Sequence, residues 1–369
     1  MSVVVFIRNV GDELTSRSSV EFSKMSSQQP QLPHPLTSEI AGFIASNQSE
    51  GFDELMLRLF THQFEKCLPY RQFARSLGVE PTSITYWREI PAIPTSAFKL
   101  ANHPLSSGAT TFLTSGTTTE IKGAHHFPST TLYDLAALTH WKSRFPDLPL
   151  SFLSPPPEEN PSSSLVHMFE QLHQSLDPQN TSPFLLRNDQ FHLAPLFQLN
   201  QPVILSGTAL AFLHLLKSHQ AIPLPKGSRL LETGGYKGTT HSLSKPNFYA
   251  ELSTFFSVPD HDIHNEYGMT ELSSQAYTNG ADGTHRFPDW CRFQIICPET
   301  GKELSPGAIG YLQIHDLANL HSVAAIRTQD FASAHPDGSF TLLGRDPGAL
   351  PRGCSRSIDD SLSPNSQIS

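Results

Sequence analysis

Hydrophobic residues recur at helical spacing in the first part of the chain that has a regular pattern. In GFDELMLRLFTHQFEKC, the apolar residues from Phe52 to Phe64 fall on one face of a helix. The spacing predicts helices within residues 38–78, with an apolar stripe turned toward a core. Two prolines in the following segment, EIPAIPTSAFK, predict an extended passage interrupted by turns.

Short apolar runs alternate with a helical stretch in the middle of the chain. TTFLTS, LSFLS, PVILSG and RLLET predict strands, whereas ALAFLHLLKSH, between the last two, predicts a helix. Strand–helix–strand order is typical of βαβ units on a parallel or mixed sheet, so we predict an α/β core over residues 38–290. RFQIICP, GYLQIHD, SVAAIRT and SFTLLGR then predict short strands. We expect residues 291–346 to form a small β-rich subdomain of the same unit.

Both ends of the chain have the composition of loose segments. Residues 1–37 are rich in Ser, Gln and Pro, which predicts a disordered arm, and residues 347–369 are expected to form a flexible tail. The apolar run at the N-terminus is too short for a secretory signal. No stretch reaches the roughly eighteen apolar residues of a membrane span. We therefore expect a cytoplasmic protein without a membrane span.

Charge and cysteine usage narrow the classes of partner. The 369 residues carry a formal net charge of −9, and no basic stripe is present to neutralise the phosphates of a nucleic acid. We expect no nucleic-acid partner. The four cysteines form no C-x-x-C pair and the 18 histidines no H-E-x-x-H arrangement, so no zinc site is predicted. Cys291 and Cys297 flank a predicted strand, and we expect both to be structural.

A polar loop that contains glycine follows the strand predicted for TTFLTS. The segment Thr114–Gly123, TSGTTTEIKG, offers hydroxyls, backbone N–H groups and the ammonium of Lys122. Groups of this kind bind phosphate oxygens. The segment lacks the G-x-x-x-x-G-K-[ST] pattern of a Walker A loop. Taken alone, it is interpreted equally well as an ordinary polar hairpin.

Two later segments carry residues suited to the other parts of a nucleotide. NEYGMTE holds two candidate carboxylates for Mg²⁺, Glu266 and Glu271, together with the flat ring of Tyr267 for a base and the hydroxyl of Thr270 for a phosphate. RTQD ends at Asp330, whose carboxylate can accept both hydroxyls of a ribose. Taken alone, the first segment also fits a helix start and the second the end of a surface strand.

In this order the three segments resemble the signature of the adenylate-forming superfamily, which includes acyl-CoA synthetases, nonribosomal adenylation domains and luciferase-type enzymes. The first is similar to that family's TSGTTG-x-PKG, with Thr119 and Ile121 where Gly and Pro are usual. YGMTE and RT-x-D are intact. Gly344-Arg345 resembles the family's hinge, without its usual downstream acidic and lysine residues. The resemblance implies the family's large domain, with mixed sheets and packed helices.

A tighter resemblance, over roughly residues 50–356, is to the LuxE family of acyl-protein synthetases. It rests on PYRQFARSLGVEPTSITYWREIPAIPTSAFK, LLETGGYKG and LLGRDPGALPRGCS. That family activates a fatty acid with ATP, holds it as a thioester on a cysteine near its C-terminus and delivers it to a partner reductase. Ordinary acyl-CoA synthetases continue past the hinge into a mobile lid domain, and we expect this chain to lack the full lid. Cys354 stands where the family pattern has the acyl-accepting thiol.

The resemblance implies roles for individual residues. ATP and Mg²⁺ are the implied cofactors, a fatty acid or related carboxylate the substrate, and an acyl reductase or acyl carrier protein the partner. Catalysis would depend on Cys354, Glu271 and Lys122, and Glu271 would also hold the metal. ATP would be bound by Thr114, Ser115, Gly116, Thr117, Thr118, Gly235, Tyr267, Gly268, Thr270, Asp330 and Arg345.

Two other functions also fit the sequence. A stand-alone ligase that joins a fatty or aryl acid to coenzyme A would leave Cys354 with a structural role. A degenerate nucleotide-binding module without catalytic activity is the third hypothesis, and the substitutions Thr119 and Ile121 favour it. The positive charges of Arg352 and Arg356 favour an acyl-protein synthetase with Cys354 as the acceptor, because nearby positive charge raises the thiolate fraction of a cysteine.

Overall fold

A computed structural model describes residues 35–46, 49–99, 107–114, 122–234, 244–281 and 283–346. All of these residues belong to one compact unit. None of the helices in the described ranges is long and apolar enough to cross a membrane. The proposed acyl-accepting residue Cys354 and the centre of the candidate phosphate loop lie outside the described residues.

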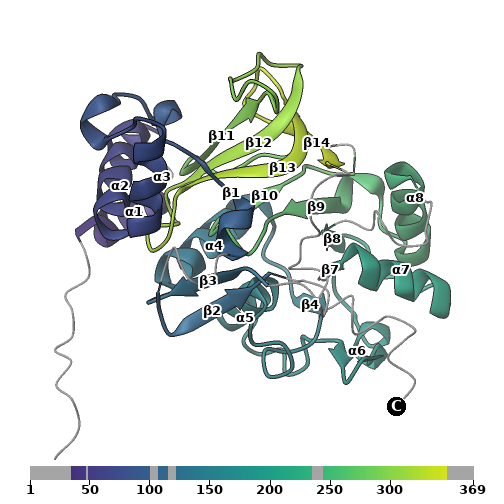
Figure 1. Cartoon of the computed structure of the whole chain (residues 1–369). Helices are drawn as coiled ribbons and strands as arrows, with labels where there is room; N and C mark the ends of the chain where they lie inside the picture. The colour runs from purple at the N-terminus through teal and green to yellow at the C-terminus, as the bar shows by residue number, and fades with distance from the viewer. Residues whose placement is uncertain are drawn as a thin grey trace, which may run out of the picture. The chain divides into compact units, whose positions relative to one another are not determined.

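Three helices form the first part of the unit (Figure 1): α1 (Pro35–Ser46), α2 (Phe52–Lys66) and α3 (Leu68–Ser76). They confirm the helices predicted within residues 38–78, although α1 begins slightly earlier because proline is well tolerated in a first helical turn. The apolar stripe of α2 is buried as predicted. The Gln63 side chain donates to the carbonyl of Asn319 over 2.8 Å and accepts from the Ala324 amide over 2.9 Å, which fixes α2 against a distant loop.

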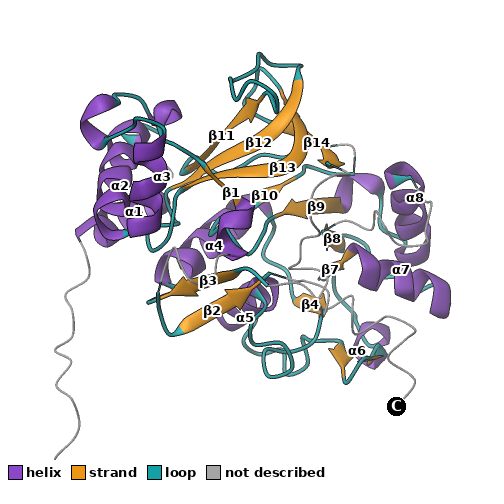
Figure 2. Ribbon diagram, in the orientation of Figure 1, coloured by secondary structure: helices purple, strands orange, loops and turns teal. Residues whose placement is uncertain are grey.

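A mostly parallel sheet has the strand order β10-β9-β8-β7-β4 (Figure 2). Strands β4, β7, β8 and β9 run parallel to one another, and β10 pairs antiparallel with β9. Most residues of these strands are buried, as expected for a sheet with both faces covered. LSFLS, PVILSG, RLLET and the helix ALAFLHLLKSH are therefore confirmed. The elements are β4 (Leu150–Leu153), β7 (Ile204–Thr208), α7 (Ala209–Ser218), β8 (Arg229–Thr233), β9 (Ile263–Tyr267) and β10 (Ala276–Tyr277).

A second, mostly antiparallel sheet contains the strands predicted after residue 290. Its order is β1-β13-β12-β11, and β14 also pairs with β13. Strand β1 comes from the EIPAIP passage and runs parallel to β13, so this sheet also draws on a much earlier part of the chain. The strands are β1 (Ile93–Pro94), β11 (Cys291–Ile296), β12 (Ile309–Asp316), β13 (Ala325–Ala334) and β14 (Phe340–Arg345).

The remaining elements complete the unit around these two sheets. Strands β2 and β3 form an antiparallel hairpin, as do β5 and β6. The hairpin strands are β2 (Thr110–Leu113), β3 (Ala124–Phe127), β5 (Leu186–Arg187) and β6 (Gln190–Phe191). The helices are α4 (Thr131–Arg144), α5 (Ser164–Leu176), α6 (Ala194–Phe197) and α8 (Lys245–Phe256), with short 3-10 turns at Pro81–Ser83, Trp87–Glu89, Thr95–Lys99 and Asp260–Asp262.

Gly207 lies at a position where the parallel strands β7 and β4 pack closely. It pairs with Leu153 across β7 and β4, and a Cβ atom at position 207 would lie 2.8 Å from the Leu153 Cβ. We predict that Gly207→Ala lowers the free energy of unfolding by about 1–3 kcal/mol, because a closely packed core resists an added methyl group.

Urea denaturation measures this change, and Gly42→Ala is the matched control. Gly42 lies on the exposed face of α1 with no atom near its Cβ position, so alanine there should stabilise by about 0.5–1 kcal/mol. Equal effects of the two substitutions would contradict the packing assigned to Gly207.

Candidate functional site

The carboxyl ends of β8 and β9 bring the candidate nucleotide segments to one edge of the parallel sheet. Strand β8 ends at Thr233 and β9 at Tyr267, and Thr233 pairs with Glu266 in the register of the two strands. YGMTE thus starts on the last residue of β9 and continues into the loop beyond it. Ligands of open α/β sheets bind outside the carboxyl ends of parallel strands, so this edge is the candidate site.

A hydrogen bond between Tyr267 and Asp330 joins YGMTE to RTQD. The Tyr267 hydroxyl donates to Oδ2 of Asp330 over 2.7 Å, although the two residues are 63 positions apart. Both side chains are buried. Asp330 lies on β13, where its register partner on β14 is Arg345. Three residues that the sequence predicted from separate motifs therefore lie together, between the parallel and the antiparallel sheet.

The ring of Tyr267 is held by aromatic neighbours. The ring centroids of His285, Phe287 and Phe340 lie 6.2, 6.3 and 6.1 Å from that of Tyr267, each in an edge-on arrangement. Edge-to-face packing of this kind is a favourable geometry for aromatic pairs. The position of the Tyr267 ring is thus fixed by packing as well as by its hydrogen bond.

The candidate phosphate segment forms the connection of the β2–β3 hairpin. At its base the Thr114 amide donates to the Gly123 carbonyl over 2.8 Å, and the Gly123 amide donates to the Thr114 hydroxyl over 2.7 Å. The strands on either side of the segment thus form a hairpin, and the end of β2 approaches YGMTE, whereas phosphate binding stays a prediction. The Thr270 hydroxyl lies 3.5 Å from the carbonyl oxygen of Leu113, the last residue of β2. Lys122 lies at the end of the connection and is exposed.

Six of the predicted site residues are not among those that the structure describes. Their roles stay predictions: Ser115, Gly116, Thr117, Thr118, Gly235 and Cys354. The predicted site residues that the structure describes near the strand ends or the hairpin are Thr114, Lys122, Tyr267, Gly268, Thr270, Glu271, Asp330 and Arg345.

The backbone around Glu271 is fixed by a buried network. The Asn319 amide group donates to the Glu271 carbonyl over 2.9 Å. Just beyond, Asp316 accepts hydrogen bonds from the Ser273 amide at 2.9 Å and the Ser274 hydroxyl at 2.7 Å. Burial raises the pKa of Asp316 to about 6, and these donors oppose that rise. Glu271 itself is also buried.

The sequence interpretation missed a buried polar cluster on β8 and β9. Glu232 accepts hydrogen bonds from the Tyr249 hydroxyl and from the Asn265 amide group, both at 2.6 Å. Nε2 of His285 lies 2.7 Å from Oδ1 of Asn265. A signal was present, because Glu232 stands inside the apolar run RLLET, where an acidic side chain must be buried with partners.

Glu266 belongs to the same cluster, and its contacts differ from those expected of a metal ligand. Its Oε2 accepts a short hydrogen bond from the Thr233 hydroxyl. Its Oε1 lies so close to Gly268 that a Cβ atom there would be 2.3 Å away, which explains a glycine at this position. Burial raises the pKa of Glu266 to about 7, the Thr233 hydrogen bond opposes the rise, and the charge of Glu232 adds to it. Of the two carboxylates proposed for Mg²⁺, Glu266 is therefore committed to an internal contact.

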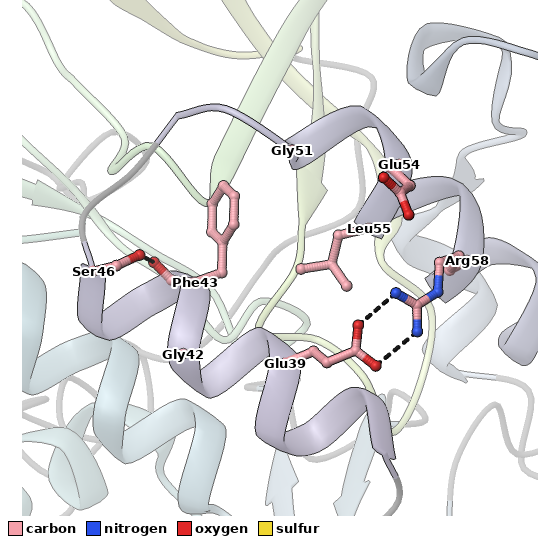
Figure 3. A pocket seen from close by; sticks show the side chains of 8 residues that line it. All are labelled: Glu39, Gly42, Phe43, Ser46, Gly51, Glu54, Leu55 and Arg58. Carbon is pink, nitrogen blue, oxygen red and sulfur yellow. Dashed lines mark hydrogen bonds and ion pairs between the residues drawn. The ribbon is translucent and has the colours of Figure 1, made fainter.

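A pocket elsewhere in the described part of the chain contains none of the predicted residues. It lies between α1 and α2, where the two terminal guanidinium nitrogens of Arg58 donate to the carboxylate of Glu39 over 2.5 and 2.7 Å (Figure 3). Phe43 and Leu55 supply its apolar wall. The Arg58–Glu39 pair is about half exposed, and such pairs contribute little to stability.

Comparison with known proteins identifies the fold. Neither the known protein-family profiles nor the curated proteins contain a match to this chain. An open conformation of 2-hydroxyisobutyryl-CoA ligase, solved in complex with 2-HIB-AMP and CoA, aligns with a TM-score of 0.61 over 81% of this chain and 76% of that one, at 10% identity. The chain has a fold similar to that of this ligase. This similarity covers most of its length and confirms the predicted α/β class with mixed sheets.

Other solved structures of this kind align less well. A luciferase-like enzyme from the nonluminescent Zophobas morio mealworm gives a TM-score of 0.47 at 14% identity, over 67% of this chain and 59% of that one. Apo MatB from Rhodopseudomonas palustris gives 0.44 at 18% identity, over 64% and 48%. The chain thus spans only about half the length of these two structures.

The raised pKa of Glu266 predicts a pH-dependent stability. A carboxyl group whose pKa is about 7 when folded and 4.5 otherwise stabilises the fold below pH 4.5, and this contribution is lost as the pH rises through 7. Glutamine keeps an acceptor for Thr233 but cannot ionise. We predict that Glu266→Gln gains about 2–3 kcal/mol relative to wild type between pH 5 and pH 8.

Urea denaturation at both pH values measures this difference. Glu251→Gln, on the exposed side of α8, is the control and should show no such trend. A stability difference between Glu266→Gln and wild type that stays constant with pH would contradict the buried, uncharged environment assigned to Glu266.

Proposed function

We propose that the chain activates a carboxylic acid by joining it to the adenylate group of ATP. The Tyr267–Asp330 hydrogen bond is the observation that carries this proposal, because it groups a ring suited to a base with a carboxylate suited to a ribose. The contact of Thr270 with the end of β2 brings the hairpin that carries the candidate phosphate segment next to YGMTE. The similar 2-hydroxyisobutyryl-CoA ligase was solved with an acyl-adenylate, 2-HIB-AMP, which supports the proposal further.

In this proposal, each site residue contacts a different part of ATP. Asp330 accepts the ribose hydroxyls, since a carboxylate has lone pairs beyond the one used by Tyr267. Tyr267 and Gly235 border the adenine. Thr270 binds the α-phosphate. The β- and γ-phosphates are bound by Lys122 and by the hydroxyls of Ser115, Thr117 and Thr118.

In the proposed first half-reaction, an oxygen of the substrate carboxylate attacks the α-phosphorus of ATP. The bond between that phosphorus and the oxygen of the β-phosphate breaks, and pyrophosphate leaves. The protein contributes mainly by positioning the reactants and by placing positive charge near the phosphates. The fixed backbone around Glu271 and the closed base of the hairpin are suited to such positioning.

The described residues are compatible with Mg²⁺. They contain no group of three acidic, histidine or cysteine side chains that would form a complete metal site. Mg²⁺ usually takes only one or two carboxylates and completes its shell with water and substrate phosphates, so the carboxylate of Glu271 meets its requirement. When bound, Mg²⁺ would neutralise charge on the phosphates.

Acid-dependent exchange of labelled pyrophosphate into ATP tests the adenylation step. We predict exchange with the wild type and a loss of at least 100-fold in Glu271→Gln, because one oxygen anion at the metal is replaced by an amide. Glu251→Gln is the control, and thermal unfolding verifies that all variants are folded. Unchanged exchange in Glu271→Gln would remove Glu271 from the reaction, and wild type without exchange would contradict adenylation itself.

We further propose that the acyl group passes to the thiol of Cys354, as in an acyl-protein synthetase for fatty acids. The Cys354 thiolate would attack the carbonyl carbon of the acyl-adenylate, the bond from that carbon to the phosphate oxygen would break, and AMP would leave. The motif RGCS and its two nearby arginines support this choice. The acyl group would then pass to an acyl reductase or an acyl carrier protein.

The described cysteines differ in their suitability as acceptors. Burial raises the pKa of Cys67 and of Cys291, which disfavours the reactive thiolate in both. Cys297 is partly exposed, and hydrogen bonds from Thr300 lower its pKa. Cys297 is therefore the most reactive competitor among the cysteines that the structure describes, and it supplies the matched control.

Substitution of the two cysteines separates the half-reactions. We predict that Cys354→Ala keeps pyrophosphate exchange but loses the hydroxylamine-sensitive label that the wild type acquires from labelled fatty acid and ATP. Cys297→Ala should keep both. If the label is lost from Cys297→Ala instead, the acceptor assignment is wrong. If the wild type never labels but forms acyl-CoA with added coenzyme A, the alternative CoA ligase is the better account.

A further inference from the structure

His125 lies where the phosphate hairpin meets YGMTE, and the proposed reaction gives it no role. It is on β3, shortly after the candidate phosphate segment, and is completely buried. Its register partner on β2 is Phe112. Nothing in the local sequence singles it out, because AHHF is typical of an ordinary hairpin strand.

Among the residues that the structure describes, His125 has one hydrogen-bond partner, and that partner lies outside the hairpin. Nδ1 of His125 lies 2.8 Å from the backbone carbonyl oxygen of Thr270. A carbonyl can only accept, so Nδ1 carries the hydrogen and donates it. The Thr270 hydroxyl reaches the Leu113 carbonyl on the other strand of the same hairpin. Thr270 is thus linked to both strands of the hairpin, through its carbonyl to β3 and through its hydroxyl to β2.

The surroundings of the imidazole fix its tautomer and orientation. Ring centroids of Phe98 and Phe127 lie 5.3 and 4.0 Å from that of His125. Burial lowers the pKa of His125 to about 3, so the ring is neutral near pH 7. Nε2 is buried and has no hydrogen-bond partner among the described residues. The neutral ring, packed between Phe98 and Phe127, therefore donates from Nδ1 to Thr270.

We propose that His125 is a positioning residue that couples the phosphate hairpin to Thr270 and Glu271 through its Nδ1–H. This inference rests on the proposed adenylation. The hairpin and YGMTE contact different parts of one nucleotide, so their relative position must be held within a fraction of an ångström for in-line attack. A buried donor bonded to the backbone of Thr270 holds that position without touching the substrate.

Three substitutions separate positioning from packing. In asparagine the amide nitrogen is as many bonds from the backbone as Nδ1, whereas in glutamine it is one bond further and matches Nε2. Leucine fills the space without a donor. We expect His125→Leu and His125→Gln to lower kcat of pyrophosphate exchange by a factor on the order of 100. His125→Asn should retain most of the wild-type kcat. The KM for the carboxylic acid should be nearly unchanged in all three variants.

If packing alone mattered, leucine would be the best substitute and asparagine the worst, which would overturn the proposal. Hydrogen exchange of the Met269–Leu272 amides gives a readout independent of activity. It should be faster in His125→Leu than in His125→Asn, and equal rates would also overturn the proposal. Absence of exchange activity in the wild type, together with this difference in amide protection, would contradict the proposed function but leave the coupling intact.

Discussion

The hydrogen bond between the Tyr267 hydroxyl and the Asp330 carboxylate is the contact on which the arrangement of the candidate site depends. It links the end of a parallel strand to a strand of the second sheet, and both partners are buried. A hydrogen bond to a charged group contributes about 1.5–3 kcal/mol, and loss of one partner leaves the other without compensation in the interior. The bond therefore also constrains how the two sheets meet at the candidate site.

Other contacts hold the neighbouring parts of the candidate site in place. Asn319 and Asp316 fix the backbone that follows YGMTE, and His125 fixes Thr270 against the hairpin. The aromatic neighbours of Tyr267 hold its ring from the sides. The proposed adenylyl transfer requires groups that are already in position when charge develops on the phosphates, and these contacts hold the site residues in place.

Much of the fold was predictable because single segments carry their own signal. RLLET and PVILSG are apolar runs of strand length, and they form buried parallel strands. YGMTE and RTQD were recognised as short patterns, but their contact through Tyr267 and Asp330 depends on how two sheets pack, which no local pattern encodes. The internal hydrogen bonds of Glu232 and Glu266 and the contact of His125 were missed for a related reason, because each depends on burial and on a partner far along the chain. Only Glu232 carried a sign of this, as an acidic residue inside the apolar run RLLET.

The affinity for ATP in variants of Tyr267 and Asp330 tests the central claim most directly. Isothermal titration of the wild type, Asp330→Ala, Tyr267→Phe and the double variant measures it, with the exposed Asp147→Ala as control. The account predicts that Asp330→Ala weakens binding by about 1.5–3 kcal/mol. It also predicts that Tyr267→Phe weakens binding less, and that it adds almost nothing once Asp330 is gone, because the tyrosine hydroxyl acts through that carboxylate. Wild-type affinity in Asp330→Ala, or fully additive losses in the double variant, would contradict it.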